Sequence, residues 1–197
     1  MLINYGAGNI LSLKCALEKV GFSVVVASKS FRVEKVDAIA LPGVGSFSTA
    51  MTEMITMKEK IFDLVKEGIP ILGICLGMQV FLSQSEEGEG KGLSFFQGKN
   101  VRLPNNVKVP HMGWNTIQVI KHGELFEGVP DRAYVYFVHS LYPVPVDKNI
   151  VSAQTFYGTT FTSAVSSKNI FGTQFHPEKS GEIGLNIIRN FLSIVKK

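Results

Sequence analysis

The heptapeptide Gly73-Ile74-Cys75-Leu76-Gly77-Met78-Gln79 carries the clearest chemical pattern in the sequence. It follows an apolar run, 69–72, that predicts a short buried strand, and it leads into a predicted helix at 78–83. A cysteine at such a corner, with glycine two residues away on each side, is typical of a nucleophile elbow, where close backbone packing needs glycine. The start of the helix favours a thiolate over a thiol. A buried cysteine that only fills space is the commoner outcome, so the pattern requires a base elsewhere in the chain.

His176 is the best candidate for that base among the four histidines. It follows a predicted strand, 170–174, and precedes Pro177 and Glu178. In extended backbone, residues two apart point the same way, and proline restricts the conformation between them. Glu178 would then orient the imidazole and stabilise its protonated form. A surface turn is the alternative for His-Pro-Glu alone, but the carboxyl ends of strands in such sheets converge on one crevice, which favours a triad with Cys75.

A thiolate that attacks an acyl carbon needs hydrogen-bond donors for the oxyanion. The N–H of Leu76, directly after the cysteine, is one candidate. The glycine-rich segment 42–45 follows another predicted strand and supplies Val44, with Gly45 beside it, as the second. An ordinary turn between a strand and a helix is the simpler interpretation of segment 42–45 taken alone.

The predicted elements would hold these residues together. In the first half, apolar strands alternate with a helix that Asn9 caps and Gly21 ends, and with a helical region at 47–66 that has a possible break. The predicted strands of this half are 1–5, 22–27, 38–41 and 69–72. The second half has strand-like segments at 99–103, 114–120, 133–139, 150–155, 160–166 and 170–174, and a final helix at 183–195. This order predicts a single domain over 1–197 with an α/β fold: a mostly parallel central sheet, helices on both faces and an antiparallel extension.

Composition excludes several classes of function. The two cysteines, Cys15 and Cys75, lie far apart, which argues against a disulfide scaffold or a thiolate zinc site and indicates a reducing compartment. No apolar run approaches the roughly 20 residues of a membrane helix, so we expect a cytoplasmic protein without membrane association. The net charge is +4, but the lysines are scattered, which gives nucleic-acid binding little support. Gly6-Ala7-Gly8 lacks the third glycine of a dinucleotide site, and no cluster has metal-ligand spacing, so we expect no cofactor and no metal.

Taken together, these motifs resemble those of the class I (triad) glutamine amidotransferases, and more narrowly the glutaminase subunits of imidazole glycerol phosphate synthase. Met78, the block Pro110-His111-Met112-Gly113-Trp114-Asn115 and Lys179 indicate the branch that serves histidine biosynthesis. The matching stretches run along the whole chain: 5–9, 41–45, 73–79, 110–115, 136–140 and 174–180.

The resemblance implies a three-layer, flavodoxin-like fold and the hydrolysis of glutamine. Cys75 would attack the side-chain amide, His176 would pass the proton to the departing ammonia, and water would release glutamate from the thioester. Four further residues match positions that hold the amino-acid moiety of glutamine: Gln79, Glu87, His139 and Ser140.

The resemblance also implies a heterodimer with a (β/α)8-barrel cyclase that receives the ammonia. In this family, glutaminase activity is low until the cyclase is bound and occupied. The residues expected to lie toward the partner are Asn9, His111, Met112, Trp114 and Lys179.

Three alternatives remain open from the sequence. The same chemistry would also serve another acceptor, such as a sugar amidinated in surface-polysaccharide synthesis. A non-catalytic module is disfavoured because Cys75, His176 and Glu178 are all present. A cysteine peptidase is disfavoured by the His-Pro-Glu motif.

Overall fold

An eight-stranded sheet forms the middle layer of the computed structural model, which describes residues 1–6, 9–28, 35–88 and 90–197. Five neighbouring strands are parallel, and three antiparallel strands extend the sheet at one edge. In spatial order, the strands are β2 (Val26–Ala27), β1 (Leu2–Ile3), β3 (Ile39–Leu41), β4 (Ile71–Ile74), β13 (Ile170–Thr173), β12 (Thr160–Ser167), β11 (Val151–Phe156) and β8 (Gln118–Val119). The predicted α/β class with an antiparallel extension is confirmed.

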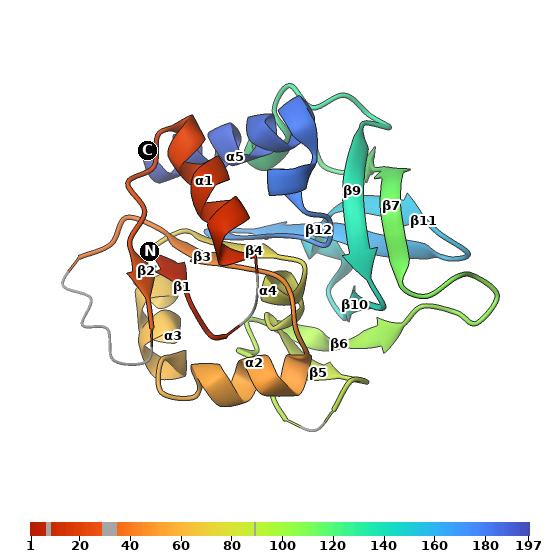
Figure 1. Ribbon diagram of the computed structural model, residues 1–197, viewed down its shortest axis with the longest axis horizontal. Helices are drawn as coiled ribbons and strands as arrows, with labels where there is room; N and C mark the ends of the chain where they lie inside the picture. The colour runs from red at the N-terminus through yellow and green to blue at the C-terminus, as the bar shows by residue number, and fades with distance from the viewer. Residues whose placement is uncertain (7–8, 29–34, 89) are drawn as a thin grey trace.

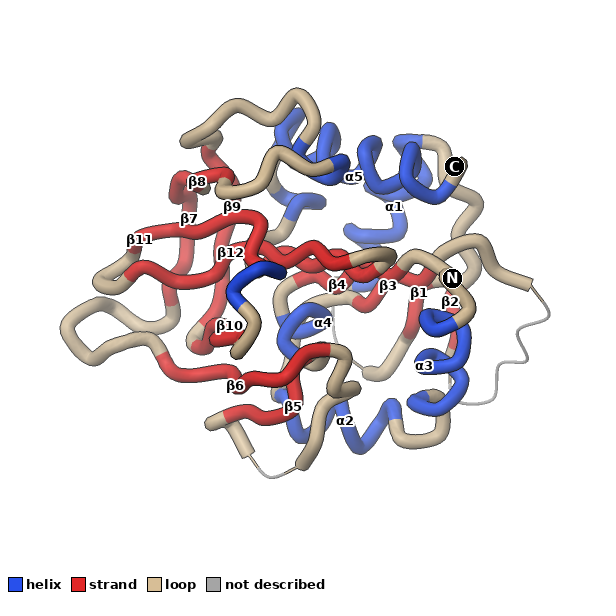
Figure 2. Tube along the Cα trace, turned by 180° about the vertical axis from the view of Figure 1, so that it is seen from behind, coloured by secondary structure: helices blue, strands red, loops and turns tan. Residues whose placement is uncertain are grey.

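Helices cover both faces of the sheet (Figures 1 and 2). The helices α1 (Ile10–Val20) and α5 (Gly181–Val195) lie on one face, and α2 (Phe47–Met54) and α3 (Lys58–Lys66) lie on the other. Each pair of helices packs on its own apolar core. The apolar strand β4 contributes side chains to both cores, because Leu72 packs into the first and Ile71 into the second. Within the described residues, none of the helices combines the length and the apolar character needed to cross a membrane.

The boundaries of several elements differ from the predictions. The predicted helix 78–83 is wrong: α4 (Leu76–Gln79) begins directly after Cys75, because the N–H groups of Met78 and Gln79 bond to the Cys75 carbonyl. The chain then extends into β5 (Leu82–Ser85). The break within 47–66 is confirmed by the gap between α2 and α3.

The second half of the chain does not all join the central sheet. Two smaller sheets form instead: β10 (Leu141–Pro145), β6 (Phe96–Arg102) and β5, and the pair β7 (His111–Thr116) and β9 (Tyr134–His139). The predicted strand 114–120 is split at Ile117, which is buried and bonds to Ala133, so β7 and β8 belong to different sheets. Three short 3-10 helices complete the described elements: η1 (Glu124–Phe126), η2 (Lys148–Ile150) and η3 (Pro177–Lys179).

Glycine is required at the elbow because backbone segments approach one another closely there. A Cβ on Gly77 would lie 2.2 Å from the Leu41 carbonyl oxygen, and one on Gly73 would lie 2.5 Å from the Gly77 carbonyl oxygen. Cys75 itself has φ 50° and ψ −106°, a conformation that L-residues seldom adopt. The elbow is therefore fixed by its neighbours on β3 and β4.

Gly77→Ala should lower the free energy of unfolding by about 2 kcal/mol, because the added methyl meets backbone that cannot move aside. The matched control is Gly123→Ala, since a Cβ there meets no atom within 4 Å. Urea unfolding of both variants checks the prediction, and a Gly77→Ala protein as stable as the control would contradict it.

Candidate active site

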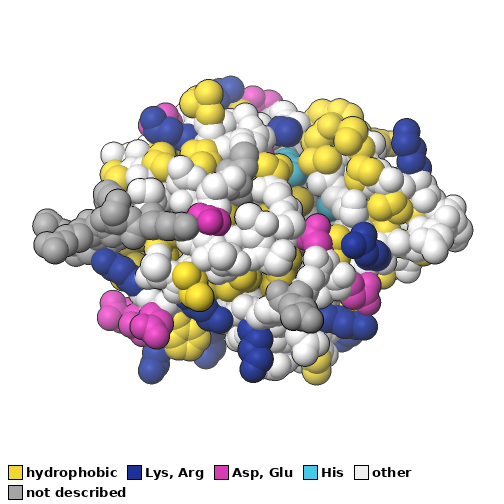
Figure 3. Space-filling view, turned by 60° about the horizontal axis from the view of Figure 1, so that its bottom comes forward, with side chains coloured by type: hydrophobic (Ala, Val, Ile, Leu, Met, Phe, Trp, Pro, Cys, Tyr) yellow, Lys and Arg dark blue, Asp and Glu magenta, His cyan; other side chains and the backbone are white. Residues whose placement is uncertain are grey.

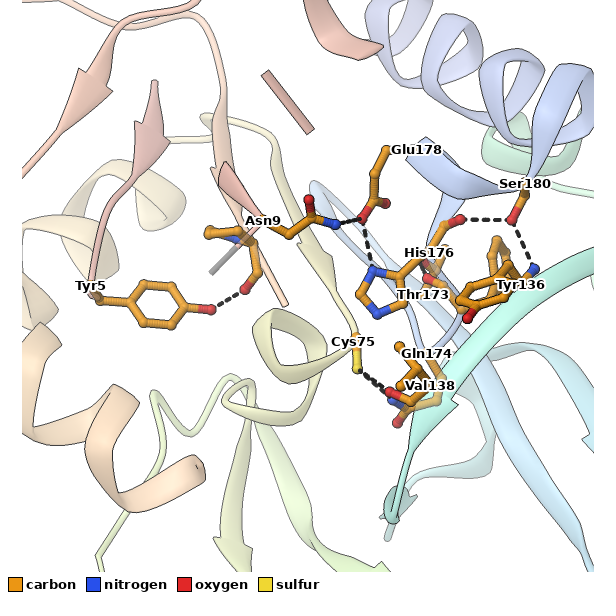
Figure 4. A network of polar contacts seen from close by, with 12 residues as sticks. Tyr5, Asn9, Cys75, Tyr136, Val138, Thr173, Gln174, His176, Glu178 and Ser180 are labelled. Atoms are coloured by element: carbon orange, nitrogen blue, oxygen red, sulfur yellow. Dashed lines mark hydrogen bonds and ion pairs between the residues drawn. The ribbon is translucent and has the colours of Figure 1, made fainter. Parts of the chain in front are cut away.

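Cys75 lies at the carboxyl end of β4, in the middle of the central sheet. The residue is 6% exposed and lines a pocket of about 240 Å³. The backbone N–H of Cys75 bonds to the Thr173 carbonyl at 2.6 Å, which ties the elbow to the end of β13. The chain that leaves β13 therefore passes directly beside the sulfur (Figure 4).

That chain carries His176 and Glu178, which lie against each other. Nδ1 of His176 is 2.8 Å from Oε1 of Glu178, and both side chains are almost completely buried. The predicted extended arrangement is wrong, because Pro177 begins the 3-10 turn η3. The His176–Glu178 pair still forms, since the turn brings the Glu178 carboxylate next to the His176 imidazole. Ser180 anchors the turn by donating to the His176 carbonyl at 2.6 Å.

The second ring nitrogen of His176, Nε2, is buried without a hydrogen bond to another described residue and points toward Cys75 (Figure 4). Burial alone would lower the pKa of His176, but the charge of the nearby Cys75 sulfur and the hydrogen-bonded Glu178 carboxylate outweigh it and raise that pKa to about 10. The environment thus favours an imidazolium between two groups able to carry negative charge.

Asn9 occupies the N-cap position of α1, as predicted, but its side chain contacts Glu178. Its backbone is left-handed, with φ 71°, and its side chain makes no cap hydrogen bond. Nδ2 of Asn9 instead lies 3.4 Å from Oε1 of Glu178. This contact joins the start of α1 to the His176–Glu178 pair.

The pocket beside Cys75 contains the predicted oxyanion residues and the four residues expected around the substrate. Its lining includes Gly43, Val44, Gly45, Leu76, Gln79, Glu87, Pro110, His139 and Ser140. Segment 42–45 is anchored to Tyr5, whose buried hydroxyl donates to the Pro42 carbonyl. Oε2 of Glu87 accepts from the N–H of Phe47 at 2.8 Å, which fixes this carboxylate at the start of α2.

Gln79 and His139 use their polar atoms within the protein. Nε2 of Gln79 donates to the Leu141 carbonyl at 2.8 Å and to Oε1 of Gln174 at 3.0 Å. Nδ1 of His139 also bonds to Leu141, and its Nε2 lies 3.0 Å from Nδ1 of His111. Sequence reasoning missed Gln174, which touches the Cys75 sulfur, although its position two residues before His176 was a usable signal.

Three of the residues expected at a partner surface lie in or beside the β7–β9 sheet. Met112 and Trp114 on β7 are 63% and 57% exposed, and Lys179 lies 5.7 Å from the Tyr136 ring centroid on β9. Figure 3 shows apolar side chains gathered in this part of the molecule, near points where histidine atoms reach the surface. His111 does not join them, because its pairing with His139 in the β7–β9 ladder buries it.

The described histidines make the free energy of unfolding depend on pH in two directions. Burial lowers the pKa of His111 to about 4 and that of His139 to about 3, so the unfolded chain takes up protons first as the pH falls below about 6.5, and stability drops. His176 acts oppositely, because its raised pKa contributes stability that is complete below about 6.5 and lost as the pH rises through about 10. Urea unfolding across this range should show greatest stability near neutrality, and stability that increases from about pH 6.5 to about pH 4 would contradict this assignment.

Among residues 1–6, 9–28, 35–88 and 90–197, no group of three His, Cys, Asp or Glu side chains is placed to hold a metal ion. Cys75, with His176 and Glu178 behind it and backbone donors beside it, is suited to acyl transfer through a thioester.

Comparison with known proteins places the whole chain in a family. The model of the class I glutamine amidotransferase family matches residues 1–195. The imidazole glycerol phosphate synthase subunit HisH of Methanothermobacter thermautotrophicus is 45% identical over 99% of this chain and 98% of its own. The HisH subunit of Methanocaldococcus jannaschii is 44% identical over 98% of each chain.

Solved structures show the same fold at low sequence identity. A putative GMP synthase protein from Thermoplasma acidophilum aligns with a TM-score of 0.77 and 21% identity, covering 99% of this chain and 92% of that one. PurLQS from Thermotoga maritima aligns with a TM-score of 0.79 and 19% identity, covering 98% and 96%. From the family model and these full-length relatives, we conclude that the chain belongs to the class I glutamine amidotransferase family.

Proposed function

We propose that this chain is the glutamine-hydrolysing subunit of an imidazole glycerol phosphate synthase and supplies ammonia for histidine biosynthesis. The observation that carries the proposal is the position of Cys75 beside the buried His176–Glu178 pair, at the edge of a pocket (Figure 4). Full-length relatives that are 44–45% identical and named as HisH subunits support the assignment to this synthase.

In the proposed reaction, the Cys75 thiolate attacks the side-chain carbonyl carbon of glutamine. His176, as imidazolium, gives its proton to the amide nitrogen, and the C–N bond breaks to release ammonia. The resulting thioester joins Cys75 to the glutamyl group. Neutral His176 then takes a proton from water, which attacks the thioester and releases glutamate and the thiolate. Glu178 holds Nδ1 of the ring, so that Nε2 handles the proton in both steps.

The backbone beside the sulfur is proposed to stabilise the oxyanion. Val44, Gly45 and Leu76 line the pocket next to Cys75, with the N–H of Leu76 as one donor and that of Val44 as the other. Glu87 and Ser140 lie on the pocket wall, where a carboxylate suits the substrate's ammonium and a hydroxyl suits its carboxylate. His139 and Gln79 complete that wall, with their polar atoms bonded inward.

The cyclase is proposed to dock on the β7–β9 sheet and receive the ammonia. Met112 and Trp114 present apolar surface there, and Lys179 adds a cation beside Tyr136. Exposed aromatic residues with a neighbouring cation are common at protein interfaces. Lys179 follows Glu178 directly, so a partner on this surface would lie against the turn that carries His176 and Glu178.

The proposal is tested by measuring glutamate release by this chain with and without a (β/α)8-barrel cyclase and its nucleotide substrate. We expect low release from the isolated chain and a strong increase when the occupied cyclase is added. No glutamate release under either condition from a folded protein would refute the function.

Trp114→Ala should weaken binding to the cyclase by about 2 kcal/mol, because large exposed aromatic side chains commonly dominate such interfaces. The stability of the isolated chain should hardly change, since Trp114 is 57% exposed. The matched control is Ile55→Ala, which removes an apolar side chain that is 70% exposed between α2 and α3. Titration calorimetry checks the prediction, and equal affinities for both variants would count against this docking surface.

A further inference from the structure

Gln174 is a buried polar side chain in direct contact with the candidate nucleophile. The residue is 0% exposed, and its Nε2 lies 3.3 Å from the Cys75 sulfur (Figure 4). Among the described residues, the Val138 carbonyl oxygen is also within hydrogen-bonding reach of this sulfur, at 3.6 Å. A carbonyl accepts only from a thiol, whereas an amide N–H donates to a thiolate, so the two neighbours favour opposite protonation states.

The orientation of the Gln174 amide is fixed by a residue distant in sequence. The Leu141 carbonyl can only accept, so Gln79 must turn its NH₂ group toward it, at 2.8 Å. The same NH₂ group donates to Oε1 of Gln174 at 3.0 Å. With its oxygen held in this way, Gln174 has to present its NH₂ group to the sulfur.

The Leu141 carbonyl also fixes a second branch of the network. In the neutral ring of His139, Nδ1–H donates to this carbonyl, so Nε2 accepts a hydrogen bond from Nδ1–H of His111. Nε2 of His111 is then an acceptor for Nδ2 of Asn115, at 3.4 Å. Both imidazoles are thereby neutral and protonated at Nδ1.

We propose that Gln174 is a positioning residue for Cys75: its amide, oriented through Gln79 by the Leu141 carbonyl, holds the sulfur and favours the thiolate. The inference deepens the proposed function where it concerns the rate of glutamine hydrolysis, but the effect on sulfur reactivity does not depend on glutamine. The titratable side chains around the sulfur are His176, Tyr5, Glu87 and His139, and Glu178 acts through His176.

The test is the pH dependence of Cys75 alkylation by iodoacetamide in the full chain. Gln174→Met removes the donor, and Gln174→Glu keeps an acceptor for Gln79 but sets a negative charge beside the sulfur. Near neutral pH, we expect alkylation to be about tenfold slower in Gln174→Met and slower still in Gln174→Glu. For both variants, the curve of Cys75 alkylation rate against pH should be displaced to higher pH, and the alkylation rate should reach that of the wild type at high pH.

Two controls separate positioning from a general change in structure. Cys15 on α1 is exposed, so its alkylation in the same samples, read by peptide mass spectrometry, should be unchanged. Gln84→Glu makes the same substitution at an exposed position on β5 and should keep the wild-type profile. Folded Gln174 variants whose Cys75 profiles superimpose on that of the wild type would overturn the proposal.

A measurement on the unaltered chain keeps the proposal testable if the variants do not fold. The side-chain amide protons of Gln174 should shift in NMR spectra over the same pH range in which Cys75 becomes reactive, and resonances that ignore this transition would overturn the proposal. A folded wild-type chain that releases no glutamate with the occupied cyclase, while the Gln174 variants still show displaced alkylation profiles, would refute the proposed function and leave this inference standing.

Discussion

Cys75→Ala should lower glutamine hydrolysis by at least about 10⁴-fold in the presence of the cyclase, because no other described side chain is placed to form the thioester. Cys75 is buried in a tight elbow, but alanine removes only the sulfur and adds no atom to it. Folding and binding to the cyclase should therefore be retained. Coupled detection of glutamate, together with titration calorimetry of the complex, measures both expectations.

The matched control for this prediction is Cys15→Ala, which removes an exposed thiol from α1. It should keep wild-type activity. A Cys75→Ala protein that still turns over glutamine in the complex would contradict the assignment of the nucleophile.

His176→Gln should lower hydrolysis by about 10³-fold, because it removes the group that protonates the departing ammonia. Glu178→Gln should cost about 10²-fold, since the ring remains but loses the carboxylate that holds Nδ1 at 2.8 Å and helps to raise the pKa of His176. The double variant should be hardly worse than His176→Gln alone, because Glu178 acts through the imidazole. Steady-state kinetics of the three variants in the complex check this ranking.

His122→Gln makes the same change at an exposed histidine and should leave the kinetics unchanged. Independent, multiplicative losses from His176→Gln and Glu178→Gln would contradict a role for Glu178 through the ring. They would indicate that the carboxylate acts elsewhere.

The parts of the site that sequence predicted are those fixed by local geometry. The glycines around Cys75 indicate that neighbouring backbone segments approach closely there. The order of the strands places that elbow beside the end of β13. His-Pro-Glu keeps its two polar residues close together in either an extended or a turned backbone. The pairing therefore formed even though the predicted local conformation was wrong.

The parts that sequence did not predict depend on registers between distant strands. The hydrogen bonds of Gln79 to Leu141 and Gln174 join residues 62 and 95 positions apart, so no local sequence pattern predicts them. His111 is buried because the β7–β9 register sets it opposite His139, whereas alternation alone cannot say which face of β7 is covered. Asn9 likewise turned toward Glu178, a residue 169 positions away.

The most direct test of the central claim is mass spectrometry of this chain quenched with acid during turnover of glutamine in the complex. We expect the peptide carrying Cys75 to gain the mass of one glutamyl group, glutamine less ammonia, and Cys75→Ala to show no such adduct. Glutamate release that proceeds in the complex while Cys75 is never acylated, and that survives Cys75→Ala, would contradict it.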